Sequence, residues 1–448
     1  MNSTKNEETN LKVQTNEKHR KENILKFLFV SIESLSGDLA WEIKKEGHEV
    51  KIFIQAEGDK DVYDGFLDKV DDWKENIDWA DVIVFDDVGF GDIAESLRSK
   101  GKLVVGGSKY TDRLEIDREF GQEEMKKVGM SVLPHWDFNE FDSAIKFIKE
   151  NPGRYVFKPS GNTPSDQKGI LFLGQEEDGM DLIEILEQNK KAWAKKIKRF
   201  QLQKMAVGVE VAVGAFFNGK DFIYPINVNF EHKKLYPGDI GPYTGEMGTS
   251  VFWCPPNEIF RGTLLKIKDE LAKSGYVGYI DINCIANAKG IYPLEFTSRF
   301  GYPTISIHIE GIQSEWGDLL MGIAKGESPE LKTKKGFQIG VVIVVPPFPF
   351  DDKKESFIYK DLSILFKKEN LEGIHLGDVK KVNEVWVIAG DSGYVLVVTG
   401  SGITMEEARK QVYARVKNVI LQNMYYRTDI GYRWPRDSDL LMTWGYLY

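Results

Sequence analysis

Short apolar runs alternate with amphipathic segments in the first part of the chain. ILKFLFVSI, starting at residue 24, predicts a buried strand, and the turn-rich SLSGD and the helical LAWEIKKEG follow it. HEVKIFI predicts a second strand, and ADVIVFDD, FGDIAESLRSKG and KLVVGG repeat the theme. The pattern therefore predicts a small α/β domain over residues 23–110, built on a doubly wound parallel sheet.

The middle of the chain has longer β-rich runs separated by charged helices. DRLEIDREFGQEEMKKVG predicts one polar helix within 111–130, and a charged helix is expected near 181–198. YVFKPSGNTPSDQKGILFL predicts two strands joined by a loop, and FQLQKMAVGVEVAVGAFF is rich in β-formers. From 251 to 330 predicted strands and helices alternate. We expect one domain over 111–330, with a lid subdomain at about 130–200.

The two ends of the chain differ from its body. Residues 1–22 are polar and lack periodicity, which is typical of a disordered tail. ELKTKKG at 330–336 predicts a linker, and GVVIVVPPFPF then opens a β-rich domain over 336–433. We expect this domain to close with a helix over 405–421. Residues 434–448 form a C-terminal extension.

Composition and charge narrow the classes of function. The 448 residues suffice for about three domains. Asp and Glu number 69 against 59 Lys and Arg, a net charge of −10, which argues against a broad nucleic-acid surface but not against a local basic groove. Cys254 and Cys284 are too few for a disulfide framework, and no apolar run reaches membrane-spanning length. We expect a cytoplasmic protein without a signal peptide or a membrane partner.

Four charged residues in or beside predicted strands could carry chemistry. Lys158 ends a strand before the loop 159–169, which can close over a polyphosphate, although an exposed lysine at a strand end is commoner. Asp281 and Glu295 lie on adjacent apolar strands and favour a magnesium site over two solvated charges at a sheet edge. Arg299 can stabilise a transferring phosphate or form a structural ion pair with Glu295.

The stretch FEHKKLYPGDIGPYTGEMG, residues 230–248, is rich in charge and glycine and poor in aliphatic residues. Long segments of this kind in compact proteins are usually functional or disordered, and we favour a substrate loop. His232 within it is either a general base or, more commonly for a lone histidine, a hydrogen-bonded structural residue.

Taken in order, these motifs resemble the ATP-grasp superfamily and, more narrowly, the glycinamide ribonucleotide synthetase (phosphoribosylamine–glycine ligase) family. HKKLYPGDIGPYTGEMG is similar to that family's H-K-R-x-x-x-G-D-x-G-P-N-T-G-G-M-G, and PLEFTSRFGYP to its L-E-F-N-x-R-F-G-D-P. YYRTDIGYR at 425–433 is similar to its Y-Y-R-x-D-I-G. The resemblance covers residues 24–433, with patchy identity.

The resemblance implies an ATP-grasp fold with an N-terminal Rossmann-like domain and a C-terminal β-rich domain. It implies an ADP-forming ligase that joins glycine to phosphoribosylamine through an acyl phosphate, a purine-biosynthesis step. ATP and Mg²⁺, for which Mn²⁺ can substitute, would be the cofactors, small molecules the partners, and a monomer or homodimer the assembly. The alternatives are a ligase that uses another amine, such as a modified nucleotide, and an inactive nucleotide-binding homologue.

The resemblance also assigns roles to residues. The ATP site would comprise Lys158, Lys168, Gly169, Gln203, Lys204, Met205 and Glu210. Lys158 and Arg299 would be catalytic, and the metal would be held by Asp281, Glu295 and Thr297. The substrates would be bound by Glu231, His232, Lys233, Asp239, Gly241, Pro242 and Thr244, with Ser36 and Gly37 from the first domain.

Departures from the family pattern concentrate around the amine substrate. The family's first glycine-rich turn carries an arginine and a histidine, which SIESLSGDLAW lacks, although its serines beside a helix N-terminus can still bind a phosphate. Tyr243, Glu246 and Tyr302 are larger or more charged than the family's residues and imply a reshaped amine pocket. Thr297 replaces an asparagine, and LEIDREFGQEE lacks an ATP-contacting lysine.

Overall fold

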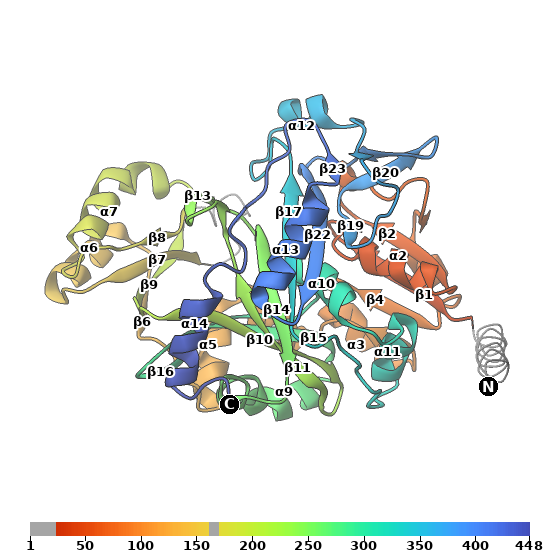
Figure 1. Cartoon of the computed structure of the whole chain (residues 1–448). Coiled ribbons are helices and arrows are strands. Elements are labelled where there is room, and N and C mark those ends of the chain that lie inside the picture. The colour runs from red at the N-terminus through yellow and green to blue at the C-terminus, as the bar shows by residue number, and fades with distance from the viewer. Residues whose placement is uncertain (1–23, 161–169) are drawn as a thin grey trace.

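The computed structural model describes residues 24–160 and 170–448 of the chain (Figure 1). The tail predicted over 1–22 lies outside these residues. Three sheets organise the described part: a parallel sheet at the N-terminus, a large antiparallel sheet, and a smaller sheet at one side.

The N-terminal sheet is parallel and has the order β3-β2-β1-β4-β5, as the alternating pattern predicts. Its strands are β1 (Lys26–Ser31), β2 (Glu49–Ile54), β3 (Asp68–Lys69), β4 (Val82–Phe85) and β5 (Leu103–Val105). The crossover helices include α2 (Gly37–Lys45) and α3 (Gly91–Ser99). Because parallel strands are buried on both faces, Phe27 to Val30 of β1 are all inaccessible to solvent.

The large sheet has eight strands in the order β16-β15-β10-β11-β14-β17-β22-β19. They are β10 (Val209–Asn218), β11 (Phe222–Glu231), β14 (Gly248–Cys254), β15 (Val277–Asn287), β16 (Gly290–Thr297), β17 (Phe337–Val344), β19 (Ile374–Leu376) and β22 (Tyr394–Gly402). β14 pairs with β17, so strands from both sides of the predicted linker at 330–336 belong to one sheet. The linker therefore joins strands of one hydrogen-bonded structure, not two separate sheets.

The two faces of this sheet differ in polarity because side chains alternate along each strand. Val209, Val211, Val213 and the next odd-numbered residues of β10 enter an apolar core with α8 (Glu258–Gly262) and α9 (Lys268–Lys273). The even-numbered residues face the other way, on the side that carries α10 (Thr304–Gly311) and α11 (Trp316–Ala324). That second face carries the polar residues of the candidate site.

A four-stranded sheet with its own apolar core lies within the range where the sequence predicts a lid. Its order is β6-β9-β7-β8, with β6 (His135–Phe138), β7 (Tyr155–Ser160), β8 (Phe172–Leu173) and β9 (Arg199–Lys204). The helices α6 (Phe141–Glu150) and α7 (Met180–Trp193) pack on it around an aromatic cluster that includes Phe157 and Phe200. Figure 1 shows these elements as a lobe beside the large sheet.

Two helix predictions need correction. The segment 111–130 holds two helices, α4 (Lys109–Ile116) and α5 (Arg118–Lys127), because Asp117 leaves the helical conformation and its side chain accepts the Phe120 backbone N–H as an N-cap. The helix predicted over 405–421 ends earlier, as α13 (Met405–Val416), and β23 (Val419–Ile420) then pairs with β18 (Leu365–Phe366).

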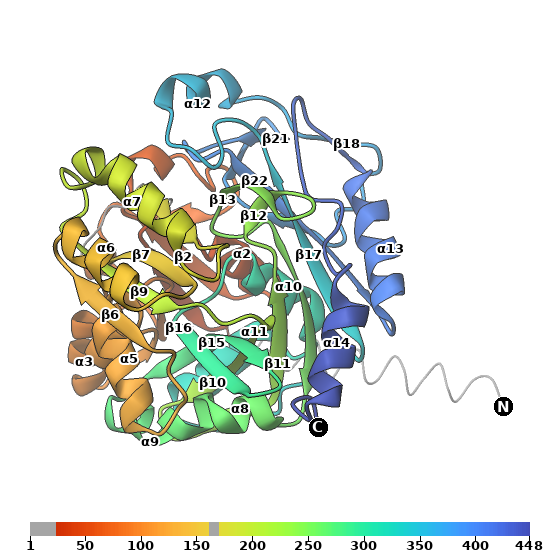
Figure 2. The same cartoon turned by 90° about the vertical axis from the view of Figure 1, so that its left-hand side faces the viewer.

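The remaining short elements surround the large sheet. They are β12 (Lys234–Tyr236), β13 (Ile240–Tyr243), α12 (Lys353–Tyr359), β20 (Val379–Val382), β21 (Val385–Ile388) and α14 (Trp434–Thr443). Figure 2 shows α13 and α14 along one side of the large sheet and the lid lobe on the other.

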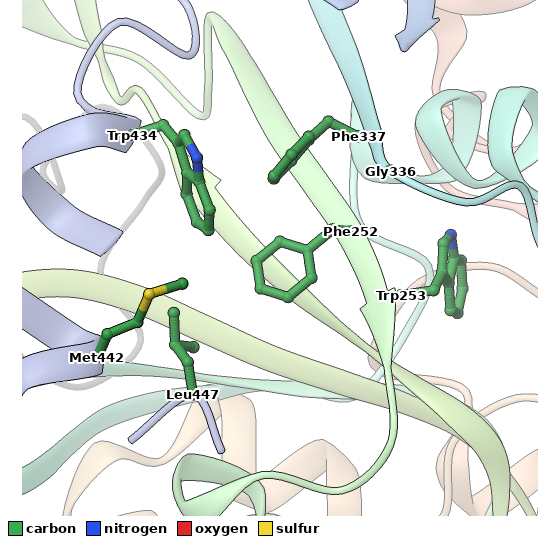
Figure 3. A pocket seen from close by; sticks show the side chains of 7 residues that line it. All are labelled: Phe252, Trp253, Gly336, Phe337, Trp434, Met442 and Leu447. Carbon is green, nitrogen blue, oxygen red and sulfur yellow. The ribbon is translucent and has the colours of Figure 1, made fainter. Parts of the chain in front are cut away.

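The C-terminal helix docks through aromatic side chains and leaves a small cavity. Trp434 packs edge-on against Phe252 and Phe337, with ring centroids 5.4 Å and 4.8 Å away. Together with Met442 and Leu447 they line a cavity of about 210 Å³ (Figure 3). This lining is aromatic and aliphatic, so the cavity belongs to the docking of the extension and offers no acid, base or phosphate ligand.

Candidate active site

Three carboxylates and one lysine converge across the neighbouring strands β16, β15, β10 and β11 of the large sheet. Lys233, just after β11, places its Nζ 3.3 Å from both Glu210 and Glu231 and 3.6 Å from Glu295. Burial alone would lower the pKa of Lys233, but the three carboxylates raise it well above its usual value. The structure thus brings together one residue expected at the ribose, one at the metal and two of the substrate loop.

The metal candidates share the polar face of the sheet. Gly214 of β10 is opposite Asp281 of β15, which is opposite Thr297 of β16, and Glu295 stands two pairs further along, opposite Asn283. Asp281 is buried, and its Oδ1 has no hydrogen-bond partner among residues 24–160 and 170–448. Burial, with Glu231 nearby, raises the pKa of Asp281 well above its usual value.

These residues fit a hard cation. A buried carboxylate oxygen without a partner is costly, and a cation beside it would remove that cost. Within the described ranges no three His, Cys, Asp or Glu side chains form a complete metal cage. Two carboxylates and a hydroxyl suit Mg²⁺, which is commonly bound by one or two carboxylates together with water and substrate phosphates.

Two carboxylates hold the Arg299 guanidinium, one on helix α4 and one just after strand β4 of the N-terminal sheet. Its Nε lies 3.2 Å from Glu115 of α4 and 3.3 Å from Asp87 after β4. Its Nη1 also donates to the Phe300 carbonyl oxygen at 3.1 Å. Burial would lower the pKa of Arg299, but Glu115 and Asp87 raise it above its usual value. The guanidinium is therefore fixed and remains charged beside the metal candidates.

Lys158 lies near the end of β7 and faces the neighbouring strand β9 of the lid sheet. Its Nζ donates to Gln203 Oε1 at 2.7 Å. Burial, together with charge repulsion from Arg118 at the start of α5, lowers the pKa of Lys158 to about 7. A phosphate would therefore find two cations close together. Lys168 and Gly169, predicted to complete this loop, lie outside the described residues.

The residues predicted to lie next to adenine, Gln203, Lys204 and Met205, are at the end of β9 and just after it. The backbone N–H groups of Lys204 and Met205 donate to the carbonyl oxygens of Pro134 and Arg154. Gln203 is buried, and its side-chain amide nitrogen has no partner among the described residues. The structure thus places these residues at the junction of the lid and the large sheet, since β10 begins shortly after them.

The substrate loop is ordered by contacts with the C-terminal segment. The fully buried Arg427 donates to Asp239 Oδ1 at 2.8 Å and to both carboxylate oxygens of Asp429. Asp239 adopts a positive φ of 58° and Gly241 one of 85°, which shape the tip of the β12–β13 hairpin, with Pro242 following. The hairpin therefore depends on residues almost 190 positions away.

The base of the same loop is pinned to the end of β11. Thr244 donates from its backbone N–H and its hydroxyl to the Lys233 carbonyl oxygen, at 2.8 and 2.9 Å. His232 is buried, and neither ring nitrogen has a partner among the described residues. Burial, together with Arg433 and Arg427, lowers the pKa of His232 to about 3. The imidazole is therefore neutral at physiological pH and does not contribute a cation to the site.

The predicted phosphate contacts at the start of α2 are already engaged. Ser36 donates from its backbone N–H and its hydroxyl to Asp86 Oδ2, at 3.0 and 2.7 Å. Gly37 faces the Tyr63 ring so closely that a Cβ there would lie 2.0 Å from a ring carbon. Asp38 adds a second carboxylate in the first turn. The structure therefore does not bring Ser36 and Gly37 to an open anion site.

Several residues of the site carry no signal that periodicity or spacing would reveal. Glu115 and Asp87 hold Arg299 from distant parts of the chain. Arg118 approaches Lys158 from a helix start that the sequence places inside a longer helix. In hindsight, the Asp117 side chain followed by a helical pattern was the available signal for that start.

The titration of the Lys158 side-chain amine provides a first testable prediction. Labelling the lysines by reductive methylation with ¹³C-formaldehyde should give one NMR signal that titrates with a midpoint near pH 7, because burial lowers the pKa of Lys158. MgATP should move the midpoint upward, since phosphate charge favours the ammonium. A Lys158→Arg variant identifies the signal. A midpoint near that of the exposed lysines would contradict the buried, cation-flanked position.

Comparisons with known proteins agree with this geometry. A family model for the ATP-grasp (A) domain of phosphoribosylglycinamide synthetase matches residues 116–305, and one for its C domain matches 338–433. A phosphoribosylamine–glycine ligase of Streptococcus pneumoniae is 26% identical over 355 residues, which are 77% of this chain and 82% of that protein. One of Listeria monocytogenes is 25% identical over 348 residues, 76% of this chain and 80% of that protein.

Solved structures share the fold at lower identity. The phosphoribosylamine–glycine ligase of Thermotoga maritima matches with a TM-score of 0.70 and 21% identity, covering 91% of this chain and 100% of that one. The biotin carboxylase domain of the 2-oxoglutarate carboxylase of Hydrogenobacter thermophilus matches with a TM-score of 0.61 and 14% identity, covering 90% and 92%.

The fold and the matched ATP-grasp domain define the chain as an ATP-grasp ligase. Within that class it belongs to the phosphoribosylglycinamide synthetase family, because the two matched domains together cover more than half of its 448 residues. The resemblance and the fold class predicted from the sequence are thereby confirmed. No helix in residues 24–160 or 170–448 is long and apolar enough to cross a membrane.

Proposed function

We propose that the protein is an ADP-forming ligase that joins an amino acid carboxylate to an amine, most specifically glycine to phosphoribosylamine in purine biosynthesis. The observation that carries the proposal is the convergence of Asp281, Glu295 and Lys233 on one face of the sheet, in a chain matched by both family domains. The relatives' names supply the specific substrates. We further propose a cytoplasmic location, in keeping with the two cysteines of the chain.

In the proposed reaction the substrate carboxylate attacks the γ-phosphate of ATP in line, which gives an acyl phosphate and ADP. The amine then attacks the acyl carbon, and phosphate leaves. Such transfers depend on positioning and on charge more than on covalent work by the protein. Lys158, with Arg118 beside it, would hold the ATP phosphates, and Arg299 would face the transferring group from its fixed position.

Asp281, Glu295 and Thr297 would hold Mg²⁺. The ion would neutralise charge on the ATP phosphates and align the carboxylate with them. Lys233 and Glu231 beside these ligands would orient the amino acid, with its carboxylate toward the lysine and its ammonium toward the glutamate. The lid sheet carrying Lys158 would exclude water from the acyl phosphate.

One observation favours a second candidate, a ligase of the same class with a different amine. The start of α2 is closed by Asp86, Asp38 and the Tyr63 ring, and Ser36 donates to a carboxylate instead of remaining available to a phosphate. A phosphate placed there would meet negative charge. An amine that carries no phosphate at this position would avoid that repulsion.

The test is ADP release from purified protein supplied with ATP, Mg²⁺ and glycine, with and without phosphoribosylamine generated in situ. ADP formed only with both substrates supports the specific proposal. Release triggered instead by other amines supports the second candidate. ATP binding without ADP release for any member of an amine and amino acid panel would refute ligase activity and leave the inactive homologue.

A further inference from the structure

Glu246 occupies a fixed position beside the carboxylate–lysine cluster. It lies in the loop between β13 and β14, which is tied to β11 on both sides of it: Thr244 donates to the Lys233 carbonyl oxygen, and Met247 N–H to that of His232 at 2.8 Å. The side chain is only 8% exposed, and its Oε1 has no hydrogen-bond partner among the described residues. A buried acceptor of this kind indicates a ligand group.

Charged and phenolic groups face Glu246 from four neighbouring elements. They are Glu210 on β10, Glu231 and Lys233 at the end of β11, Asp281 on β15 and Tyr394 on β22. Four of these five belong to the site where the acyl phosphate would form. Glu246 therefore lies in the electrostatic surroundings of that site, on the side of the substrate loop.

The fifth group connects Glu246 to a second acidic region. Tyr394 stacks on Tyr302 with ring centroids 4.4 Å apart, and the buried hydroxyls of both rings have no partner among residues 24–160 and 170–448. Beyond this pair, Asp378 accepts from Ser34 at 3.2 Å and from Ser392. The phenols therefore lie between Glu246 and the N-terminal domain.

This second region is acidic and is bordered by two lysines: Lys360 pairs with Asp61 and Asp391, and Lys380 pairs with Asp61. Burial, with Asp59 nearby, raises the pKa of Asp378 to about 8, and burial, with Glu33 nearby, raises that of Asp59 to about 6. With a pKa of about 8, Asp378 is mostly protonated at neutral pH, so the region carries less negative charge than its carboxyl groups suggest.

We propose that Glu246 is a catalytic base that takes a proton from the acceptor amine as its nitrogen attacks the acyl phosphate. The inference rests on the proposed ligase function and names a residue of the amide-forming step. An acceptor ammonium loses two N–H protons: as the nitrogen forms the C–N bond and the acyl C–O bond to the phosphate breaks, one leaves on the departing phosphate, and the other has passed to the Glu246 carboxylate. It leaves the site with the phosphate or with water, so the carboxylate is restored.

The environment of Glu246 suits this role. An ammonium has no lone pair for attack, so a nearby carboxylate without a partner is needed to accept its proton. Burial, with Glu231 nearby, raises the pKa of Glu246 well above its usual value, which brings its basicity closer to that of an amine. Positioned bases typically contribute about 100-fold or more to such steps.

The test compares two nucleophiles that intercept the same acyl phosphate. Hydroxylamine is mostly unprotonated at neutral pH and yields a hydroxamate without needing a base, whereas phosphoribosylamine or ammonia yields an amide. In Glu246→Gln we expect the ratio of amide to hydroxamate formation to fall about 100-fold. The rise of the amide rate with pH that reflects Glu246 ionisation should disappear. Glu123→Gln, the same change at an exposed position, is the matched control.

The possible outcomes distinguish a failure of the Glu246 proposal from a failure of the proposed ligase function. Absence of hydroxamate from the wild-type protein with ATP, Mg²⁺ and glycine would refute the proposed function. Hydroxamate from the wild-type protein, with an unchanged amide-to-hydroxamate ratio in Glu246→Gln, would refute the base and leave the ligase intact. Because hydroxamate formation requires a folded ATP site, it also reports on the fold of the variant.

Discussion

Asp281→Asn is expected to abolish glycine-dependent ADP formation, by about 1000-fold or more, without destabilising the protein. The carboxylate is buried, and its Oδ1 lacks a partner among the described residues, so its removal takes away a candidate metal ligand and no internal hydrogen bond of that atom. A loss of about 4 kcal/mol of transition-state stabilisation corresponds to this factor.

The stability part of this prediction follows from proton linkage. Burial, with Glu231 nearby, raises the pKa of Asp281 well above its usual value. The folded protein then holds a proton that the unfolded chain releases, so this group makes stability fall as the pH rises from the unfolded toward the folded pKa. Asparagine cannot ionise, so the substitution removes this fall in stability with rising pH. Calorimetry of Asp281→Asn at pH 8 should therefore show an unfolding temperature equal to or above that of the wild type.

Binding gives a readout separate from turnover. Mn²⁺ binding in the presence of ADP, followed by electron paramagnetic resonance, should weaken in Asp281→Asn. It should remain normal in Asp269→Asn, a control on the exposed surface of α9. Wild-type turnover together with wild-type Mn²⁺ binding in Asp281→Asn would remove this residue from the metal site.

Arg427→Met is expected to free the β12–β13 hairpin and to destabilise the protein by about 3 kcal/mol, the lower end for breaking a buried ion pair. The guanidinium is fully buried and bridges Asp239 to Asp429, while Asp429 also accepts the Gly238 backbone N–H at 2.9 Å. Removal of the cation leaves two carboxylates without their shared partner.

Limited proteolysis measures this release, because Tyr236 at the hairpin is 47% exposed and offers a chymotryptic site. We expect faster cleavage there and a raised KM for glycine, since Lys233 and Thr244 belong to the same loop. Arg261→Met removes an exposed arginine that pairs with Glu258 and is the control. Wild-type cleavage and KM in Arg427→Met would show that the hairpin holds its shape without the arginine.

The same arginine predicts a pH dependence. Burial would raise the pKa of Asp429, but Arg427 and the Gly238 N–H lower it to about 2. The folded pKa lies below the unfolded one, so this carboxylate stabilises the protein above the unfolded pKa, and the contribution is lost as the pH falls toward 2. The stability gap between wild type and Arg427→Met should therefore narrow below about pH 4.

The alternation of apolar and polar residues was sufficient to predict the two strands, β15 and β16, that carry the metal candidates of the site. The β15 and β16 sequences are apolar except for a few charges, and the turn NAKG between them predicts adjacent strands. The structure forms that hairpin, with Asn287 opposite Gly290, and places Asp281 and Glu295 on one face. Period-two alternation explains this success, because it determines which side chains share a face once two strands pair.

The parts that escaped prediction depend on contacts between distant residues. The ion pairs of Arg299 join it to Glu115 and Asp87, and no periodicity relates positions that far apart. The closure of the α2 N-terminus depends on Asp86 and on Tyr63, which reach Ser36 and Gly37 only after the sheet has formed. The resemblance located the phosphate contacts by motif position, and tertiary packing decides what occupies them.

The pairing of β14 with β17 has a consequence for dividing the gene. A cut between residues 330 and 336 falls in a segment that looks like a linker, yet it would separate neighbouring strands of one sheet. Each fragment would expose an unpaired strand edge, which promotes aggregation when the fragment is made alone. Co-expressed halves would instead be expected to recombine along that edge, which makes this position suitable for a split reporter of assembly.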